Sequence, residues 1–131
     1  MLYSIAYFNS AVIIGIILFQ SSLIAPSINR IINQKEASIF LRYIWPKFFL
    51  IIALLSLISF FSVIFSEINN GIIYVCLVIS IITMFFCYIL TPFINKAKDL
   101  SNIKLWKNLH MITIILTLLN VILNFVVIVQ Y

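Results

Sequence analysis

The basic residues of this 131-residue chain are confined to two short windows, and this distribution most constrains its fold. The eight Lys and Arg residues are Arg30, Lys35, Arg42 and Lys47, followed by Lys96, Lys98, Lys104 and Lys107. Of the three acidic residues, Glu67 alone lies outside these windows. Four runs without Asp, Glu, Lys or Arg therefore remain, at 1–29, 48–66, 72–95 and 108–131.

Each of these runs is long enough to cross a membrane as a helix. About 20 apolar residues at a rise of 1.5 Å cover a hydrocarbon core of about 30 Å. In lipid the backbone must satisfy its own hydrogen bonds, and a β-barrel would instead show short segments of alternating polarity. We predict an all-α, single-domain integral membrane four-helix bundle, with helices at roughly 4–28, 46–66, 72–94 and 108–130.

The composition excludes a soluble globular domain. Hydrophobic residues make up 65% of the chain and charged residues 8%, whereas soluble domains have about 25% charged residues. The two Gly, three Pro and two Cys residues also exclude a collagen-like fibre and a disulfide scaffold. The net charge of +5 is explained by loops that meet anionic headgroups, so we do not expect a nucleic-acid partner.

The position of the basic windows predicts the orientation. Lys and Arg are retained in the cytoplasm, so both windows should be cytoplasmic and both termini outside (N-out/C-out). The first run should stay in the fold, because no basic residue precedes it as in a signal peptide. The segment 67–71 predicts a tight hairpin built on residues that tolerate positive φ, and Pro46 is expected in the first turn of the second helix. We expect a multi-pass protein of the bacterial inner (plasma) membrane.

Polar and small residues predict which helix faces pack against protein. On the fourth helix one narrow arc gathers His110, Thr113, Thr117, Asn120 and Asn124. The corresponding stripe of the third helix is Cys76, Ser80, Thr83 and Cys87. Such residues form hydrogen bonds between membrane helices, which accounts for them without a ligand, although a ligand site on the fourth helix stays open.

The first helix presents a face of small residues, and the second helix gives no clear face. The first-helix face contains a small-xxx-small pair and consists of Ser4, Ala11, Gly15, Leu18 and Ser22. A pair such as Ala11 and Gly15 allows close backbone approach, so we predict that this face packs and that Ile13 faces lipid. On the second helix we expect the small residues to be spread around the cylinder, and they are Ala53, Ser56, Ser59, Ser62 and Ser66.

The sequence contains no catalytic, metal-binding or nucleotide-binding motif. No carboxylate lies inside a charge-free run, as proton-coupled transport would need, and His110 is the single histidine. We therefore predict no catalytic residue, no metal site and no cofactor, and this favours a protein without enzymatic activity.

Two stretches resemble a known family. The first is the run 21–26 (SSLIAP) followed by Ala37, Phe40, Arg42 and the run 44–48 (IWPKF). The second is the run 91–99 (TPFINKAKD) followed by Trp106, Leu109, His110 and Asn120. Together they are similar to the transmembrane protein 205-like family, catalogued as domain of unknown function 4149, although Trp106 stands where the family pattern has Phe. The resemblance implies a four-helix membrane protein with no established biochemical activity.

The predicted topology brings the unusual residues of both stretches to the cytoplasmic end. The candidate cluster consists of Arg42, Trp45, Asn95, Asp99, Trp106 and His110. Asp99 is the expected partner of His110, and the cluster would suit a lipid headgroup, a partner loop or a small anion. The alternative is an ordinary interfacial aromatic belt with helix-end prolines, namely Pro26, Pro46 and Pro92.

Two classes of function follow from these observations. The first is a structural or accessory membrane protein that binds partner helices or lipid. Its partners would be membrane lipid and other membrane proteins, or a second copy of the chain. The alternative is a membrane protein that handles a small molecule, haem or a metal, with transport or redox activity.

Overall fold

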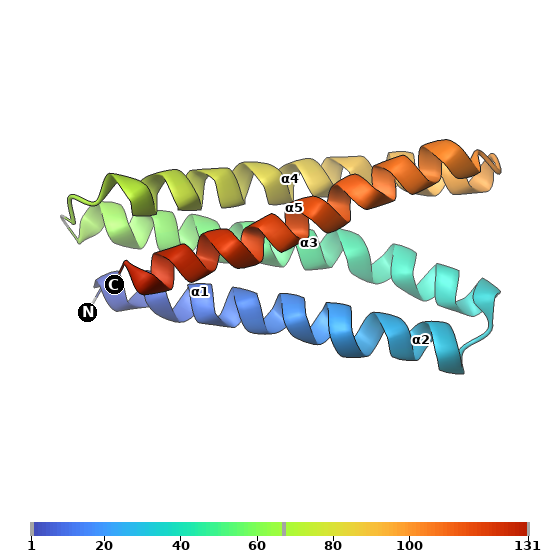
Figure 1. Ribbon diagram of the computed structural model, residues 1–131, viewed down its shortest axis with the longest axis horizontal. Helices are drawn as coiled ribbons and strands as arrows, with labels where there is room; N and C mark the ends of the chain where they lie inside the picture. Colours follow the sequence, from blue (N-terminus) through green and yellow to red (C-terminus); the bar gives the residue numbers. More distant parts are fainter. Residues whose placement is uncertain (1, 67, 131) are drawn as a thin grey trace.

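The computed structural model describes residues 2–66 and 68–130, which fold into long helices joined by short connections (Figure 1). The elements are α1 (Leu2–Phe19), the π-helical segment η1 (Gln20–Ile24), α2 (Ala25–Ile31), α3 (Gln34–Phe65), α4 (Gly71–Asp99) and α5 (Ile103–Val129). The first three elements follow one another without a break and form a single rod. The predicted all-α four-helix architecture is confirmed.

Four helices are long and apolar enough to cross a membrane. They cover Ser4–Ile31, Gln34–Phe65, Gly71–Asp99 and Ile103–Val129, with mean hydropathies of 2.1 to 2.8 in their most apolar windows. At 1.5 Å per residue the 32 residues of α3 extend about 48 Å, well beyond a hydrocarbon core of about 30 Å. The helices therefore continue into the headgroup region.

The basic windows are largely helical, so the helices begin and end at other residues than predicted. Asn33 caps α3 by accepting a 3.0 Å hydrogen bond from the N–H of Glu36, which starts this helix a full twelve residues before Pro46. The placement of Pro46 in the first turn is therefore wrong, because it lies inside α3, as Pro92 lies inside α4. The free energy gained by capping the helix at Asn33 and continuing it through Pro46 outweighs the backbone hydrogen bond that is lost at the proline.

The turn between α3 and α4 does not use positive φ in its described residues. Asn70 has a φ of −114° and caps α4 by accepting a hydrogen bond from the N–H of Ile72, and Gly71 is already helical. Among residues 2–66 and 68–130, Ser101 is the one non-glycine residue with a positive φ (55°), and it lies in the connection from α4 to α5. The predicted role of Glu67 in the hairpin lies outside the described residues.

The helices form a ring in which α1 packs against α3 and α5, and α4 packs against the same two helices. Both termini lie at one end of the bundle, here named the terminal end (Figure 1). The connections α2–α3 and α4–α5 lie at the opposite end, here named the basic end because the two basic windows surround them. Within the described chain, α2 has backbone neighbours in α3 but none in α5, so the ring opens at the basic end.

The core consists of two apolar clusters separated by polar residues. The terminal cluster contains Ala6, Val63, Ile73, Cys76, Leu77 and Val127. The basic-end cluster contains Ile13, Ile17, Phe48, Phe49, Ile52, Ala53, Met84 and Cys87. Buried polar side chains from all four spans lie between them, here named the polar belt: Ser10, Ser56, Ser59, Ser80, Asn120 and Asn124.

Hydrogen bonds inside the polar belt join three helices. The hydroxyls of Ser56 and Ser80 lie 2.8 Å apart and link α3 to α4. The Ser80 hydroxyl donates to Oδ1 of Asn120, whose Nδ2 donates to Thr83 Oγ1 at 2.8 Å. Asn120 is fully buried, so its amide links α5 to α4 at a place where bulk water cannot compete for these hydrogen bonds.

The predicted packing face of α1 is wrong. Ser4, Ala11, Gly15, Leu18 and Ser22 are all exposed, and a Cβ built on Gly15 meets no atom within 4 Å. The buried face is instead Ala6, Asn9, Ser10, Ile13, Ile17 and Gln20. The small residues that allow close packing are on α3, where Ala53, Ser56, Ser59 and Ser62 are buried and accommodate the larger side chains of α1 and α4.

Candidate functional site

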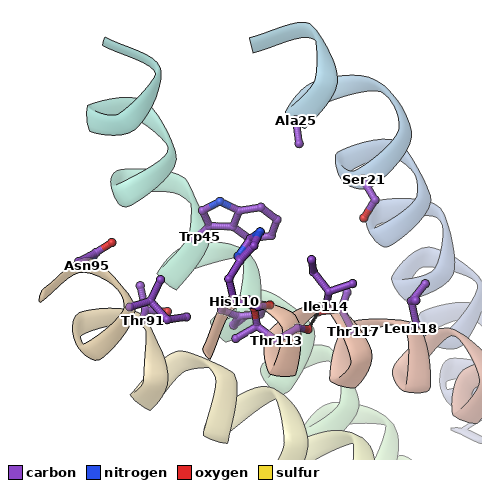
Figure 2. Close-up of a pocket in the computed structure, with 12 residues that line it drawn as sticks. Ser21, Ala25, Trp45, Thr91, Asn95, His110, Thr113, Ile114, Thr117 and Leu118 are labelled. Atoms are coloured by element: carbon purple, nitrogen blue, oxygen red, sulfur yellow. Dashed lines mark hydrogen bonds between the residues drawn. The ribbon is translucent and has the colours of Figure 1, made fainter. Parts of the chain in front are cut away.

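A pocket lies at the open basic end of the bundle (Figure 2). This inner pocket has a volume of about 310 Å³ and takes side chains from all four spans. Ser21 comes from η1, Ala25 from α2, and Trp45 and Phe49 from α3. The remaining lining residues are Thr91, Ile94 and Asn95 of α4, with His110, Thr113, Ile114, Thr117 and Leu118 of α5.

A second cavity continues from the inner pocket toward the basic loops. This outer pocket has a volume of about 340 Å³ and shares Ala25, Trp45, Ile94, Asn95 and His110 with the inner one. Its remaining walls are more polar and include Asn29, Gln34, Arg42, Lys98 and Trp106. Trp45 and His110 thus stand at the junction of an inner compartment and a basic outer one.

The π-helical segment shapes the wall that leaves the pocket open. The N–H of Ala25 donates to the carbonyl of Gln20, a bond across five residues, and Pro26 follows immediately. Proline has no N–H for the carbonyl of Ser22 and its ring crowds that carbonyl, so a wider turn relieves the clash. The wider turn lies at the level where η1 and α2 lose contact with α5.

Aromatic stacking positions the side chains at the junction. The rings of Trp106 and His110, one helical turn apart on α5, stack with centroids 5.5 Å apart and an interplanar angle of 7°. Trp45 stacks on Phe49 at 5.7 Å and meets the edge of Phe48 at 5.4 Å. Figure 2 shows Trp45 and His110 directed into the same region from α3 and α5.

An ion pair joins α3 to α4 at the basic end. Arg42 Nη1 donates to Asp99 Oδ2 at 3.1 Å, and Nη2 donates to the other carboxylate oxygen. The predicted pairing of Asp99 with His110 is therefore wrong: the fork of the guanidinium matches both carboxylate oxygens, and His110 stacks on Trp106 instead. Arg42 Nε is buried and has no hydrogen-bond partner.

The outer pocket carries an excess of positive charge. Arg42 and Lys98 line it, and Asp99 neutralises one of these two cations. Lys98 also lies over the ring of Trp106, with Nζ 5.6 Å from the centroid. The outer compartment is therefore suited to an anionic group, while the inner compartment is walled mainly by apolar and hydroxyl side chains.

The structure brings most of the predicted cluster together. Trp45, Asn95 and His110 line both pockets, Arg42 and Trp106 line the outer one, and Asp99 is held at its rim by Arg42. Pro46 and Pro92 line a separate groove between α3 and α4, so they are not part of the pocket. The sequence analysis missed Ser21, Ala25, Phe49 and Thr91 as walls. Pro26 is the one residue that could have indicated an irregular helix next to Ser21 and Ala25.

The sulfur and carboxylate side chains do not gather into a metal site within residues 2–66 and 68–130. No group of three or more His, Cys, Asp and Glu side chains in this part of the chain could hold a metal ion. Cys76 and Cys87 are free thiols, each buried in a different core cluster.

These features define a class: an all-α membrane protein of four spanning helices, with a pocket enclosed by all four at its basic end. The chain belongs to the family described as Domain of unknown function (DUF4149), which matches residues 9–103. The match includes the walls of the pocket from η1 through α4 and ends at the start of α5. It confirms the resemblance to domain of unknown function 4149, whereas the transmembrane protein 205-like name is not confirmed. No curated protein and no solved structure matches the chain.

Proposed function

We propose that this protein is an accessory membrane protein that binds a lipid, with the hydrocarbon part in the inner pocket and an anionic headgroup in the outer one. The observation that carries the proposal is the polarity gradient along two connected cavities. The inner walls are supplied by residues such as Phe49, Ile114 and Leu118, and the outer walls by Arg42 and Lys98. Each cavity falls within the range of about 300–1,000 Å³ typical of ligand sites.

The position of the pocket supports entry from the membrane. Its wall on α5 includes Ile114 and Leu118, which are exposed side chains of a spanning helix. On the opposite side, α2 has no backbone neighbour in α5. A lipid could therefore reach the inner pocket sideways, without passing through water.

The tryptophan and basic residues of the outer pocket are of the types that favour the headgroup region of a membrane. Tryptophan is favoured at membrane interfaces, and Trp45 and Trp106 frame the outer pocket. Basic side chains on the cytoplasmic side attract anionic lipids. With the basic end cytoplasmic, the lipid would come from the inner leaflet of a bacterial plasma membrane.

Lipid retention measured by native mass spectrometry would test this proposal. The purified protein would be delipidated stepwise in detergent, and the bound species would be identified. We expect the wild type to retain an anionic phospholipid and Ile114→Trp to lose it, because the indole would fill the inner pocket. Ile115→Trp is the matched control, since Ile115 is the next residue on α5, does not line the pocket and is 57% exposed. Equal lipid retention by the two variants would overturn the proposal.

A further inference from the structure

The polar belt contains two buried atoms that its own hydrogen bonds leave unsatisfied. They are Ser10 Oγ on α1 and Asn124 Oδ1 on α5. Both side chains are almost completely enclosed, with exposed fractions of 0% for Ser10 and 1% for Asn124. In a membrane-spanning bundle such atoms cannot turn to bulk water, and leaving them without partners costs free energy comparable to a lost hydrogen bond.

Helix geometry places Ser10 and Asn124 at a similar depth on neighbouring helices. Ala6 of α1 and Val127 of α5 meet in the terminal cluster, and the two helices run antiparallel (Figure 1). Ser10 lies four residues beyond Ala6, and Asn124 lies three residues before Val127. At 1.5 Å per residue both are about 4.5–6 Å deeper in the bundle than the terminal cluster.

We infer that the polar belt binds an internal water molecule between Ser10 Oγ and Asn124 Oδ1. Buried waters occupy sites with two to four polar partners that would otherwise be unsatisfied. The water donates one hydrogen to Asn124 Oδ1 and exchanges a second hydrogen bond with the Ser10 hydroxyl, which can both donate and accept. Asn124 Nδ2 is already engaged, because it donates to the carbonyl of Asn120 at 2.9 Å.

This water would complete the polar belt around the ring. Direct hydrogen bonds already join α3, α4 and α5 through Ser56, Ser80 and Asn120. On α1, Asn9 Nδ2 donates a long 3.4 Å hydrogen bond to the carbonyl of Leu55 in α3. The bridged Ser10 would attach α1 to α5 at the centre of the bundle, independently of any lipid in the pocket.

Water-edited solid-state NMR in lipid bilayers would test the inference. Polarisation would be transferred from water to ¹⁵N-labelled Asn side chains of the wild type and of Ser10→Ala. We expect transfer to the Asn124 amide several-fold above that to Asn120, which is equally buried but satisfied by Ser80 and Thr83. In Ser10→Ala the Asn124 signal should fall to the Asn120 level.

Two results would overturn the inference. One is equal transfer to Asn124 and Asn120 in the wild type, which would show a dry belt. The other is an unchanged Asn124 signal in Ser10→Ala, which would place the water away from Ser10. Thermal unfolding gives a second measurement, because removal of an unpaired hydroxyl should leave Tm unchanged or raise it, whereas loss of a water bridge should lower Tm.

Discussion

Arg42 and Asp99 are 57 residues apart in the chain and form a bidentate ion pair that joins α3 to α4 at the rim of the outer pocket. Asp99 neutralises Arg42 but forms no ion pair with Lys98, which lines the same pocket. The ion pair thus organises the mouth of the pocket in two ways, by fixing the position of Arg42 and by determining which positive charge remains available.

Asp99→Asn should lower Tm by no more than a few degrees, because Asp99 is exposed, Arg42 is partly exposed, and ion pairs that water reaches contribute little. The difference from wild type should disappear at about 1 M salt, where the screening length is about 3 Å. Thermal unfolding in detergent at low and high salt would measure both effects. Glu36→Gln, which removes another exposed carboxylate at the basic end, is the control. A loss of Tm that persists at high salt would contradict the assigned role.

Gly15→Leu should leave the thermal stability unchanged, because Gly15 faces outward and a Cβ there meets no atom within 4 Å. Ile13→Ala should destabilise the bundle by about 2–5 kcal/mol, since it opens a cavity at a completely buried side chain of the basic-end cluster. Reversible unfolding of both variants in detergent would measure the difference. Destabilisation by Gly15→Leu, with Ile13→Ala near wild type, would show that α1 packs through the opposite face.

Asn120→Leu should destabilise the protein by about 0.6–2 kcal/mol for each of its two lost contacts to α4, because Ser80 and Thr83 lose their partner on α5. Ile122→Leu is the control on the same helix, where the side chain is 60% exposed. The free energy of unfolding would be compared between the two variants. Equal stability would mean that the polar belt contributes nothing to helix association.

The orientation can be tested with single cysteines in a variant that lacks Cys76 and Cys87. Cysteine at Asn70, in the turn at the terminal end, should react with a membrane-impermeant thiol reagent on intact cells. Cysteine at Gln34, at the basic end, should react only after the cells are opened. The reverse labelling pattern would invert the proposed topology.

The charge pattern was sufficient to predict the number of spans, because a charged side chain in hydrocarbon is costly enough to dominate every other preference. It also placed Arg42, Trp45, Asn95 and His110 at one end, where they share a pocket wall. The face of α1 could not be predicted in the same way. Apolar residues surround that helix, so the completely buried Ile13 and the exposed Leu18 look alike in sequence, and the partner surface on α3 decides which of them is buried.

The pocket itself was beyond the sequence analysis for a different reason. Its existence depends on how far η1 and α2 stand from α5. Pro26 indicates an irregular turn beside the pocket, but the distance from that turn to α5 is set by packing between helices and not by the pattern of one helix. Helix ends were also mispredicted at Pro46, because a cap at Asn33 extends α3 through the basic window. In both cases the deciding contact lies outside the apolar run itself: at Asn33 for the start of α3, and between α2 and its neighbours for the pocket.

The connection between α2 and α3 consists of residues 32 and 33 alone. Such a link spans at most about 11 Å between the flanking helical residues, so the end of α2 cannot separate from the start of α3. On this side of the pocket, a change in size would therefore require rotation of α2 about the link, with a bend at the π-helical segment. Movement of that kind would widen the gap toward α5 while the α3 wall, with Trp45, stays in place. The short connection thus holds the edge of the pocket between α2 and α3, whereas the edge between α2 and α5 has no such constraint.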